Sequence, residues 1–95
     1  MTTEAEVYEA LVLRVVLTHG GARCYYNAAG QLHRSTGPAV EWPNGDQVWV
    51  HKGLRHRTDG PAVVSADGYK EWWINGVEYT KDEYHLQLKL LGHAS

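Results

Sequence analysis

Residues 53–63 read GLRHRTDGPAV, and a closely similar block stands 23 positions earlier, where residues 30–40 read GQLHRSTGPAV. Seven positions of the block are identical in the two copies, namely Gly, His, Arg, Gly, Pro, Ala and Val. The interval extends beyond the block, because Tyr26, Trp49 and Trp72 are also spaced by 23 residues. A fixed period of this length is typical of repeat proteins, in which each unit buries its apolar face against its neighbours. The sequence therefore predicts a repeat protein.

Strand-like runs separated by turn signals fill each unit. Glycine follows Asn44, Asp67 and Asn75, and Asn-Gly and Asp-Gly pairs favour hairpin turns because glycine adopts positive φ without steric cost. We predict a mainly β fold of three successive antiparallel hairpins in a twisted, elongated sheet, with the aromatic residues at 26, 49 and 72 in one stripe. The expected strands lie at residues 11–18, 23–26, 39–42, 47–51, 62–65 and 69–74.

After residue 79 the pattern changes from strand to helix. Thr80 and Glu83 have the spacing of a capping box, and Tyr84, Leu88 and Leu91 recur at helical intervals. We predict an amphipathic helix over residues 81–91, ended by Gly92, that covers the open edge or apolar face of the last hairpin.

The whole chain, residues 1–95, is short enough to form a single small domain. It divides into a polar N-terminal segment at 1–10, where a capping-box spacing indicates a short helix over 4–10, a degenerate first hairpin at 11–29, repeat hairpins at 30–79 and a capping helix at 80–92.

Composition excludes several classes of function. The net charge of −2 disfavours nucleic acid and anionic membranes as partners, and the single cysteine, Cys24, excludes an internal disulfide or a zinc site of paired cysteines. The apolar run at residues 11–17 is too short to cross a bilayer and lacks the basic leader of a signal peptide. A cytoplasmic protein is expected.

The spacing Gly-x-x-His-Arg-x-x-Gly-Pro-Ala, with an aromatic strand after the next glycine, resembles MORN-type repeat proteins. The resemblance is to the bacterial and viral variant with units of the form W-x-x-N-G-x-x-H-R-x-D-G-P-A, and it covers residues 15–79. It implies an elongated array of antiparallel β-hairpins and no reaction. Thr36 departs from the pattern, which usually has Asp there, as Asp59 has in the next unit. From the resemblance we expect a phage or mobile-element accessory protein that inhibits a bacterial defence or regulatory protein, in a bacterial cell or infected host.

His33 and His56 are the first candidates for metal binding or acid–base chemistry. A metal site needs three or four converging ligands, whereas only two histidines repeat, and each stands beside an arginine. We expect each imidazole to bond a turn carbonyl and hold the Gly-Pro corner, and no metal to bind. Arg57 is expected to form a charge-assisted pair with Asp59, and a ladder of Arg34 and Arg57 would bind a carboxylate or a phosphate backbone.

No nucleophile elbow, phosphate loop, zinc motif or carboxylate pair is found, so neither a catalytic residue nor a cofactor is predicted, and the chain is not expected to be an enzyme. Because neighbouring strand residues point to opposite faces, Trp72 and Trp73 cannot share one face of the sheet. One of the two indoles must therefore be covered by the C-terminal helix, a partner subunit or a target. We predict a non-enzymatic protein-binding module. Its expected partner-binding residues are Trp49, Trp72, Trp73, Arg34, Arg57, His33 and His56.

Two other classes of function stay open. One is a self-associating structural module, a homodimer that buries the extra tryptophan or pairs the first strand. The other is a single-stranded nucleic-acid binder that stacks bases on the tryptophan and tyrosine rings beside the basic residues.

Overall fold

The computed structural model describes residues 12–92, and the helix predicted at 4–10 lies outside them. Within this range the chain is mainly β, with a single helix of ten residues at its C-terminal end. The elements are β1 (Arg14–Leu17), β2 (Arg23–Tyr26), β3 (Val40–Glu41), β4 (Gln47–Val48), β5 (Val50–His51), β6 (Leu54–Arg55), β7 (Val63–Val64), β8 (Lys70–Ile74), β9 (Val77–Tyr79) and α2 (Lys81–Leu90).

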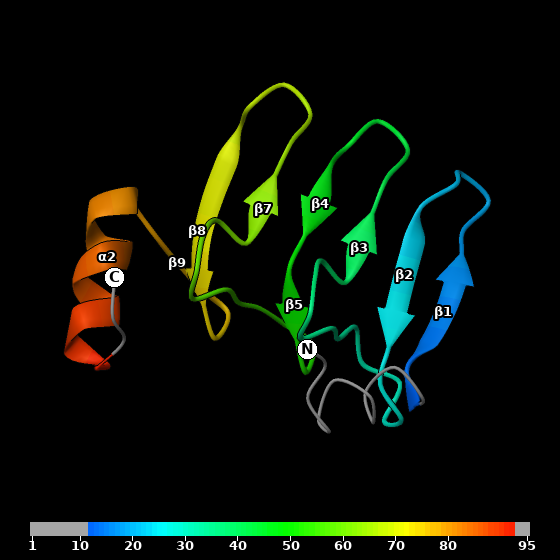
Figure 1. The fold of residues 1–95 in the computed structure, drawn as a ribbon, viewed down its shortest axis with the longest axis horizontal. Helices are drawn as coiled ribbons and strands as arrows, with labels where there is room; N and C mark the ends of the chain where they lie inside the picture. The colour runs from blue at the N-terminus through cyan, green and yellow to red at the C-terminus, as the bar shows by residue number, and fades with distance from the viewer. Residues whose placement is uncertain (1–11, 93–95) are drawn as a thin grey trace, which may run out of the picture.

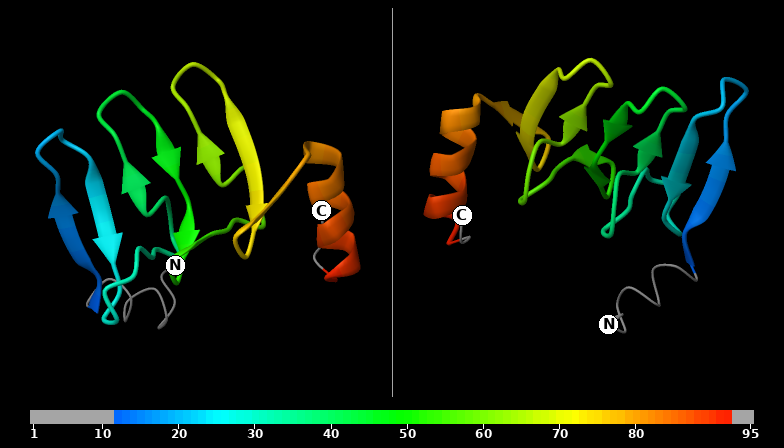
Figure 2. Two further views of the ribbon diagram at one scale, coloured as in Figure 1. Left: turned by 180° about the vertical axis from the view of Figure 1, so that it is seen from behind. Right: turned by 45° about the horizontal axis from the view of Figure 1, so that its top comes forward.

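The larger sheet is antiparallel and has the strand order β1-β2-β3-β4-β7-β8-β9, while β5 and β6 pair separately. Three hairpins, β1–β2, β3–β4 and β7–β8, stand side by side with their turns at the same end, and α2 lies beyond β8 (Figure 1). The view from behind and the tilted view show the same curved row (Figure 2). The predicted fold of antiparallel hairpins closed by a C-terminal helix is confirmed.

Most strands are shorter than predicted, and in one run the reason is a change of partner. The run at residues 47–51 is divided at Trp49, where β4 pairs with β7 and β5 pairs with β6. At this point the N–H of Trp49 bonds to the carbonyl of Ala62, and its carbonyl accepts the N–H of His56. One predicted strand therefore serves two ladders.

Strand pairing shows which residues of the hairpins occupy equivalent places. The residue of β3 that pairs with Cys24 on one side pairs with Val48 on the other. The equivalent residue of β7 pairs with Val48 on one side and with Glu71 on the other. The interval is 24 residues from Cys24 to Val48 and 23 from Val48 to Glu71. The additional residue lies in the turn at 27–31, which is one residue longer than the corresponding turn at 51–54.

This shift corrects the predicted aromatic stripe. Tyr25, and not its neighbour Tyr26, lies level with Trp49 and Trp72. From Gly30 onward the contacts described below recur at 23 residues, and we call residues 30–52 the first unit and residues 53–75 the second unit.

The core is thin and divided into two clusters. Ala39 and Ala62, the alanines that follow Gly-Pro, are both 0% exposed, so a longer side chain has no room at either position. The cluster near the first hairpin contains Ala22, Cys24 and Val40, and the cluster beneath α2 contains Ile74, Tyr84 and Leu88.

The helix α2 begins as its sequence predicts. Thr80 Oγ1 accepts the N–H of Glu83 at 3.2 Å, and the Glu83 carboxylate accepts the N–H of Thr80 at 2.9 Å. Tyr84 and Leu88 are buried against β8, whereas Leu91 is exposed and forms the C-cap, followed by Gly92 at φ 81°. Among residues 12–92, no helix has the length and apolar character needed to cross a membrane.

Tyr84 attaches the helix to the second unit. Its ring is fully buried, its hydroxyl donates to the carbonyl of Arg57, and the same oxygen accepts the N–H of Gly60 at 3.3 Å. Burial raises the pKa of this phenol above its usual value, although the bond from Gly60 acts in the opposite direction. The helix therefore closes the Gly-Pro loop of the last unit.

Candidate functional site

The arginine of the second unit is held between an aromatic ring and its own loop. The guanidinium of Arg57 lies 3.8 Å from the ring centroid of Trp49, and its Nη1 donates to the carbonyl of Pro61 at 3.0 Å. A Cβ added at Gly60 would lie 3.0 Å from the guanidinium carbon. The glycine before proline is therefore required because the guanidinium packs against its backbone.

The first unit repeats this arrangement with a different ring. The guanidinium of Arg34 lies 4.1 Å from the centroid of Tyr25, and its Nη1 donates to the carbonyl of Pro38 at 3.2 Å. A Cβ at Gly37 would lie 3.1 Å from the guanidinium carbon. Cation–π contact and a charge-assisted bond thus fix both Gly-Pro loops on the sheet.

The two repeated histidines bind the turn that follows their own loop. Nδ1 of His33 accepts the backbone N–H of Lys52 at 2.9 Å, and Nδ1 of His56 accepts that of Asn75 at 2.9 Å. Both donors lie in left-handed backbone, with φ of 48° and 47°. The sequence predicted a bond from each imidazole to a turn carbonyl, and the bond made by Nδ1 of each ring is to a turn N–H. The imidazole must therefore carry its proton on Nε2 when it accepts this bond.

A third histidine joins the other two in space. The ring of His51 lies 4.7 Å from that of His33 and 5.8 Å from that of His56, centroid to centroid. Sequence reasoning missed His51 because the 23-residue interval places Ile74 at its equivalent position. Within residues 12–92, no group of three or more His, Cys, Asp or Glu side chains is placed to hold a metal ion.

The acidic partners of the arginines differ between the units. Arg57 Nε donates to Asp59 at 2.9 Å, as predicted, and the Asp59 side chain is 77% exposed. Thr36 occupies the corresponding position in the first unit, and Arg34 instead bonds Glu41 at 3.3 Å.

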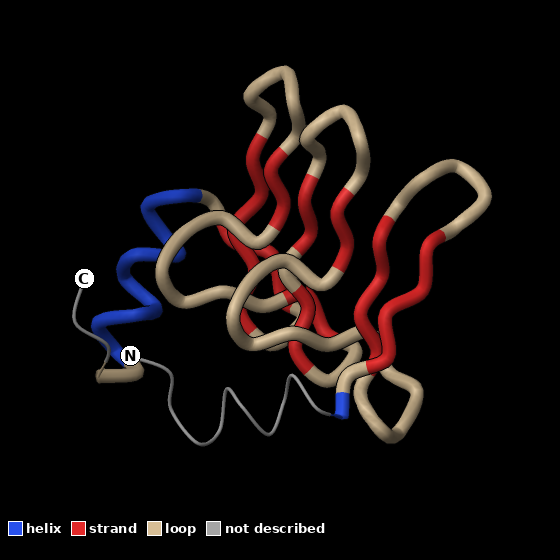
Figure 3. Tube along the Cα trace, turned by 45° about the vertical axis from the view of Figure 1, so that its right-hand side comes forward, coloured by secondary structure: helices blue, strands red, loops and turns tan. Residues whose placement is uncertain are grey.

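The two Gly-Pro loops lie side by side in front of the strands (Figure 3), and a recess of about 330 Å³ lies between them. We call this recess the central groove. It brings together four of the seven predicted partner-binding residues, Arg34, Arg57, Trp49 and His56, and adds His51. The full lining is Arg34, Ser35, Trp49, His51, His56, Arg57, Thr58 and Asp59.

The other three predicted residues lie elsewhere. His33 is buried, with 8% of its surface exposed. Trp73 points to the other face, where the Arg55 guanidinium lies 5.0 Å from its ring and its Nε1 donates to Glu71 at 2.8 Å. Trp72 packs against the cluster beneath α2.

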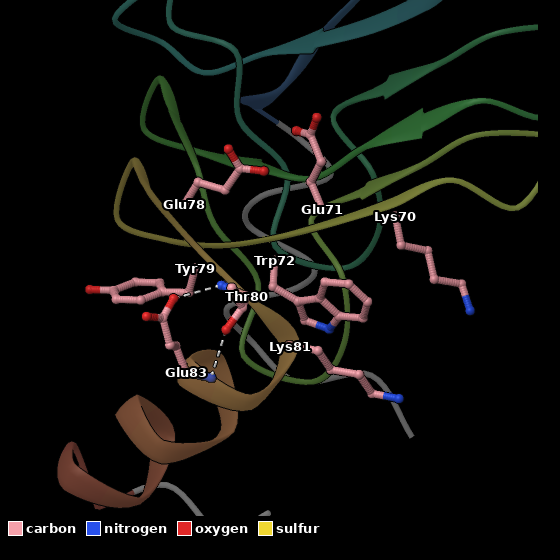
Figure 4. A pocket seen from close by; sticks show the side chains of 8 residues that line it. All are labelled: Lys70, Glu71, Trp72, Glu78, Tyr79, Thr80, Lys81 and Glu83. Atoms are coloured by element: carbon pink, nitrogen blue, oxygen red, sulfur yellow. Dashed lines mark hydrogen bonds between the residues drawn. The ribbon is translucent and has the colours of Figure 1, made fainter.

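Trp72 lines a second recess, of about 390 Å³, between the end of the sheet and the start of α2. The Lys81 ammonium lies 6.0 Å from its ring, so a lysine stands where each repeat unit has an arginine. Glu71 and Glu78 lie on the opposite side of the strands from the indole (Figure 4). Hydrogen bonds, first from the Tyr69 hydroxyl and then from the Trp73 indole, hold the pKa of Glu71 below its usual value.

Comparison of the chain with protein-family models, with curated proteins and with solved structures finds no match. The chemistry of the central groove is that of hydrogen-bond donors and aromatic surface: two guanidinium groups, two imidazoles, one indole and two hydroxyls beside a single carboxylate. Such a set is chemically suited to bind a ligand that carries oxygen acceptors.

Proposed function

We propose that this chain is a non-enzymatic protein-binding module that contacts its partner through the central groove. The observation that carries the proposal is the groove itself, in which Arg34 and Arg57 from two adjacent repeat loops and Trp49 from between β4 and β5 line one recess. Tryptophan and arginine are enriched among the residues that dominate binding energy in protein interfaces. Stacked repeats also expose a continuous surface that suits a macromolecular partner.

The resemblance to the bacterial and viral MORN-type repeats supports a more specific form of this proposal. In that form, the partner is a bacterial defence or regulatory protein, and the chain is an accessory protein of a phage or mobile element that inhibits it. This step is an analogy at the level of the family.

The test is capture of a partner from bacterial lysate by the full chain and two variants. Thr58→Tyr places a bulky ring in the groove, whereas Ala29→Tyr places the same ring on the exposed turn at 27–31, outside the groove lining. We expect a protein captured by the wild type and by Ala29→Tyr to be lost with Thr58→Tyr, with circular dichroism showing that all three are folded. Equal capture by both variants would exclude the groove.

Self-association through β1 is a second candidate. All four residues of this edge strand are exposed, and Val15, Val16 and Leu17 are 52%, 37% and 70% exposed. In the described part of the chain, β1 pairs on one side only, with β2, and an apolar edge of this kind invites pairing with another chain. Light scattering after size-exclusion chromatography should show a dimer that Val15→Lys dissociates. A strict monomer at micromolar concentration rejects this candidate.

A further inference from the structure

We infer that the central groove takes an acidic side chain of the partner, the carboxylate of an aspartate or glutamate held between Arg34 and Arg57. This inference rests on the proposed function and specifies its chemistry. It follows from the donors that line the groove, from the donors still without a bond, and from the charge of the whole chain.

Donors far outnumber acceptors in the groove. The only carboxylate in its lining belongs to Asp59, which lies at the exposed rim and already accepts a bond from Arg57 Nε. A ligand that brings further donors would meet like groups, whereas a ligand that brings oxygen acceptors would be complementary. The lining therefore selects an oxyanion.

Each arginine keeps part of its bonding capacity. Both bonds of Arg34, to Pro38 and Glu41, use Nη1, and the bonds of Arg57 use Nη1 and Nε. Nη2 of neither arginine has a hydrogen-bond partner within residues 12–92. A guanidinium carries five N–H donors in a fixed plane, and both side chains keep about a quarter or a fifth of their surface exposed, 25% and 21%. These guanidinium groups are already fixed by their rings and loops, so binding a carboxylate costs little further ordering.

Trp49 adds a second indication from the wall of the groove. Its Nε1 is buried and has no hydrogen-bond partner in the described part of the chain. Buried donors are normally paired, and because Trp49 lines the groove, the signal of this indole N–H can report a ligand that enters it.

The charge of the chain distinguishes a single carboxylate from a nucleic-acid backbone. A net charge of −2 repels a polyanion along its length, whereas nucleic-acid binding needs many phosphates neutralised together. One carboxylate at the groove meets two guanidinium groups locally. A protein side chain is therefore the better occupant.

The experiment follows the tryptophan indole N–H signals of the ¹⁵N-labelled full chain by NMR, with Trp49→Phe assigning one of the four signals. The probe is a blocked tetra-aspartate peptide, and blocked tetra-asparagine is its neutral control. We expect tetra-aspartate at millimolar concentration to shift the Trp49 signal in a saturable way, and tetra-asparagine to leave it in place.

A matched pair of variants locates the effect. Thr58→Glu adds a carboxylate to the groove and should weaken peptide binding at least tenfold, whereas the isosteric Thr58→Gln should change it less than about threefold, a difference of roughly 0.7 kcal/mol or more between the two. No shift with tetra-aspartate, or equal effects of the two variants, would overturn the inference. A thymidine oligonucleotide that shifts the Trp49 signal at lower concentration than the peptide would overturn it in favour of nucleic acid.

Failure of this inference can be distinguished from failure of the proposed function. If lysate capture depends on the groove but tetra-aspartate has no effect, the acidic chemistry is wrong and the protein-binding function stands. If Thr58→Tyr leaves capture unchanged, the proposed function itself fails.

Discussion

The first unit and the second unit make the same set of contacts but differ in the residues that surround them. In both, the histidine accepts a turn N–H and the arginine lies on a ring and bonds a proline carbonyl. The ring is tyrosine in one and tryptophan in the other, and the acidic partner is Glu41 in one and Asp59 in the other. The first unit is followed by another unit, whereas the second is followed by α2.

This difference separates the residues that form a unit from those that adapt it to its neighbours. Within the repeated block, the identical His and Arg residues and the Gly-Pro pair make the same contact in both units, and the alanine after proline is fully buried in both. The differing residues need only satisfy a general requirement, a flat ring under the guanidinium or a carboxylate within its reach. Tyr84 belongs to neither unit, and it closes the end of the array by bonding the backbone of the last loop.

The largest effect is expected where the second unit depends on α2. Tyr84→Ala removes a fully buried ring and two hydrogen bonds and should lower the free energy of unfolding by about 3–5 kcal/mol. Leu86→Ala on the exposed face of the same helix, 56% exposed, should change it by less than about 0.5 kcal/mol. Urea denaturation of both variants measures the difference, and a loss below about 1 kcal/mol for Tyr84→Ala would show that the helix does not close the array.

Alkaline pH should weaken the same attachment. Because burial raises the pKa of Tyr84, the neutral phenol is favoured in the folded state. Its contribution is constant below the ordinary pKa of 10.0, where the phenol is neutral in both states, and is lost above it, where the unfolded phenol ionises first. The urea midpoint of the wild type should therefore fall more steeply above pH 10 than that of Tyr84→Phe. Parallel curves would contradict the burial of this hydroxyl.

Alanine substitution of either glycine under a guanidinium group should lower the stability of the chain by a similar amount. A Cβ at Gly37 or at Gly60 would lie 3.1 or 3.0 Å from a guanidinium carbon that its ring and loop hold in place, so each alanine substitution should cost about 1–3 kcal/mol. Gly20→Ala, with nothing within 4 Å of the added carbon, is the control. Thermal denaturation of the three variants measures these losses of stability, and clearly different losses for the two glycines would contradict the equivalence of the units.

A smaller effect should distinguish the two histidine-bound turns. Lys52 and Asn75 both adopt positive φ, which asparagine tolerates better than lysine. Lys52→Asn should stabilise the chain by up to about 1 kcal/mol, and Asn75→Lys should destabilise it by a similar amount. Chemical denaturation of the two variants checks this, and a loss of stability with Lys52→Asn would contradict the equivalence of the turns.

Local chemistry explains what the sequence predicted correctly. Asn75 indicates a turn because asparagine is suited to left-handed backbone. Thr80 and Glu83, three residues apart, indicate a helix start because the side chain of each bonds the backbone N–H of the other. The pair of Arg57 and Asp59 is likewise a contact between near neighbours in the chain.

The features that were missed depend on spatial register. One additional residue in the turn at 27–31 brings Tyr25 instead of Tyr26 level with the later tryptophans, and an interval counted along the sequence cannot show this. His51 has an isoleucine at the equivalent position of the next unit, so no repeated histidine indicates that its ring lies 4.7 Å from that of His33. The groove needs both loops to be placed before its lining can be recognised.

The most direct test of the equivalence of the two units is the tautomer of His33 and His56, read from the ¹⁵N chemical shifts of their ring nitrogens at neutral pH. Both Nδ1 atoms accept a backbone N–H, so both rings should be neutral with the proton on Nε2, and each Nδ1 should show coupling across the hydrogen bond to the amide of Lys52 or Asn75. A proton on Nδ1 of either ring would contradict the account, because that histidine could not then hold the turn of its unit.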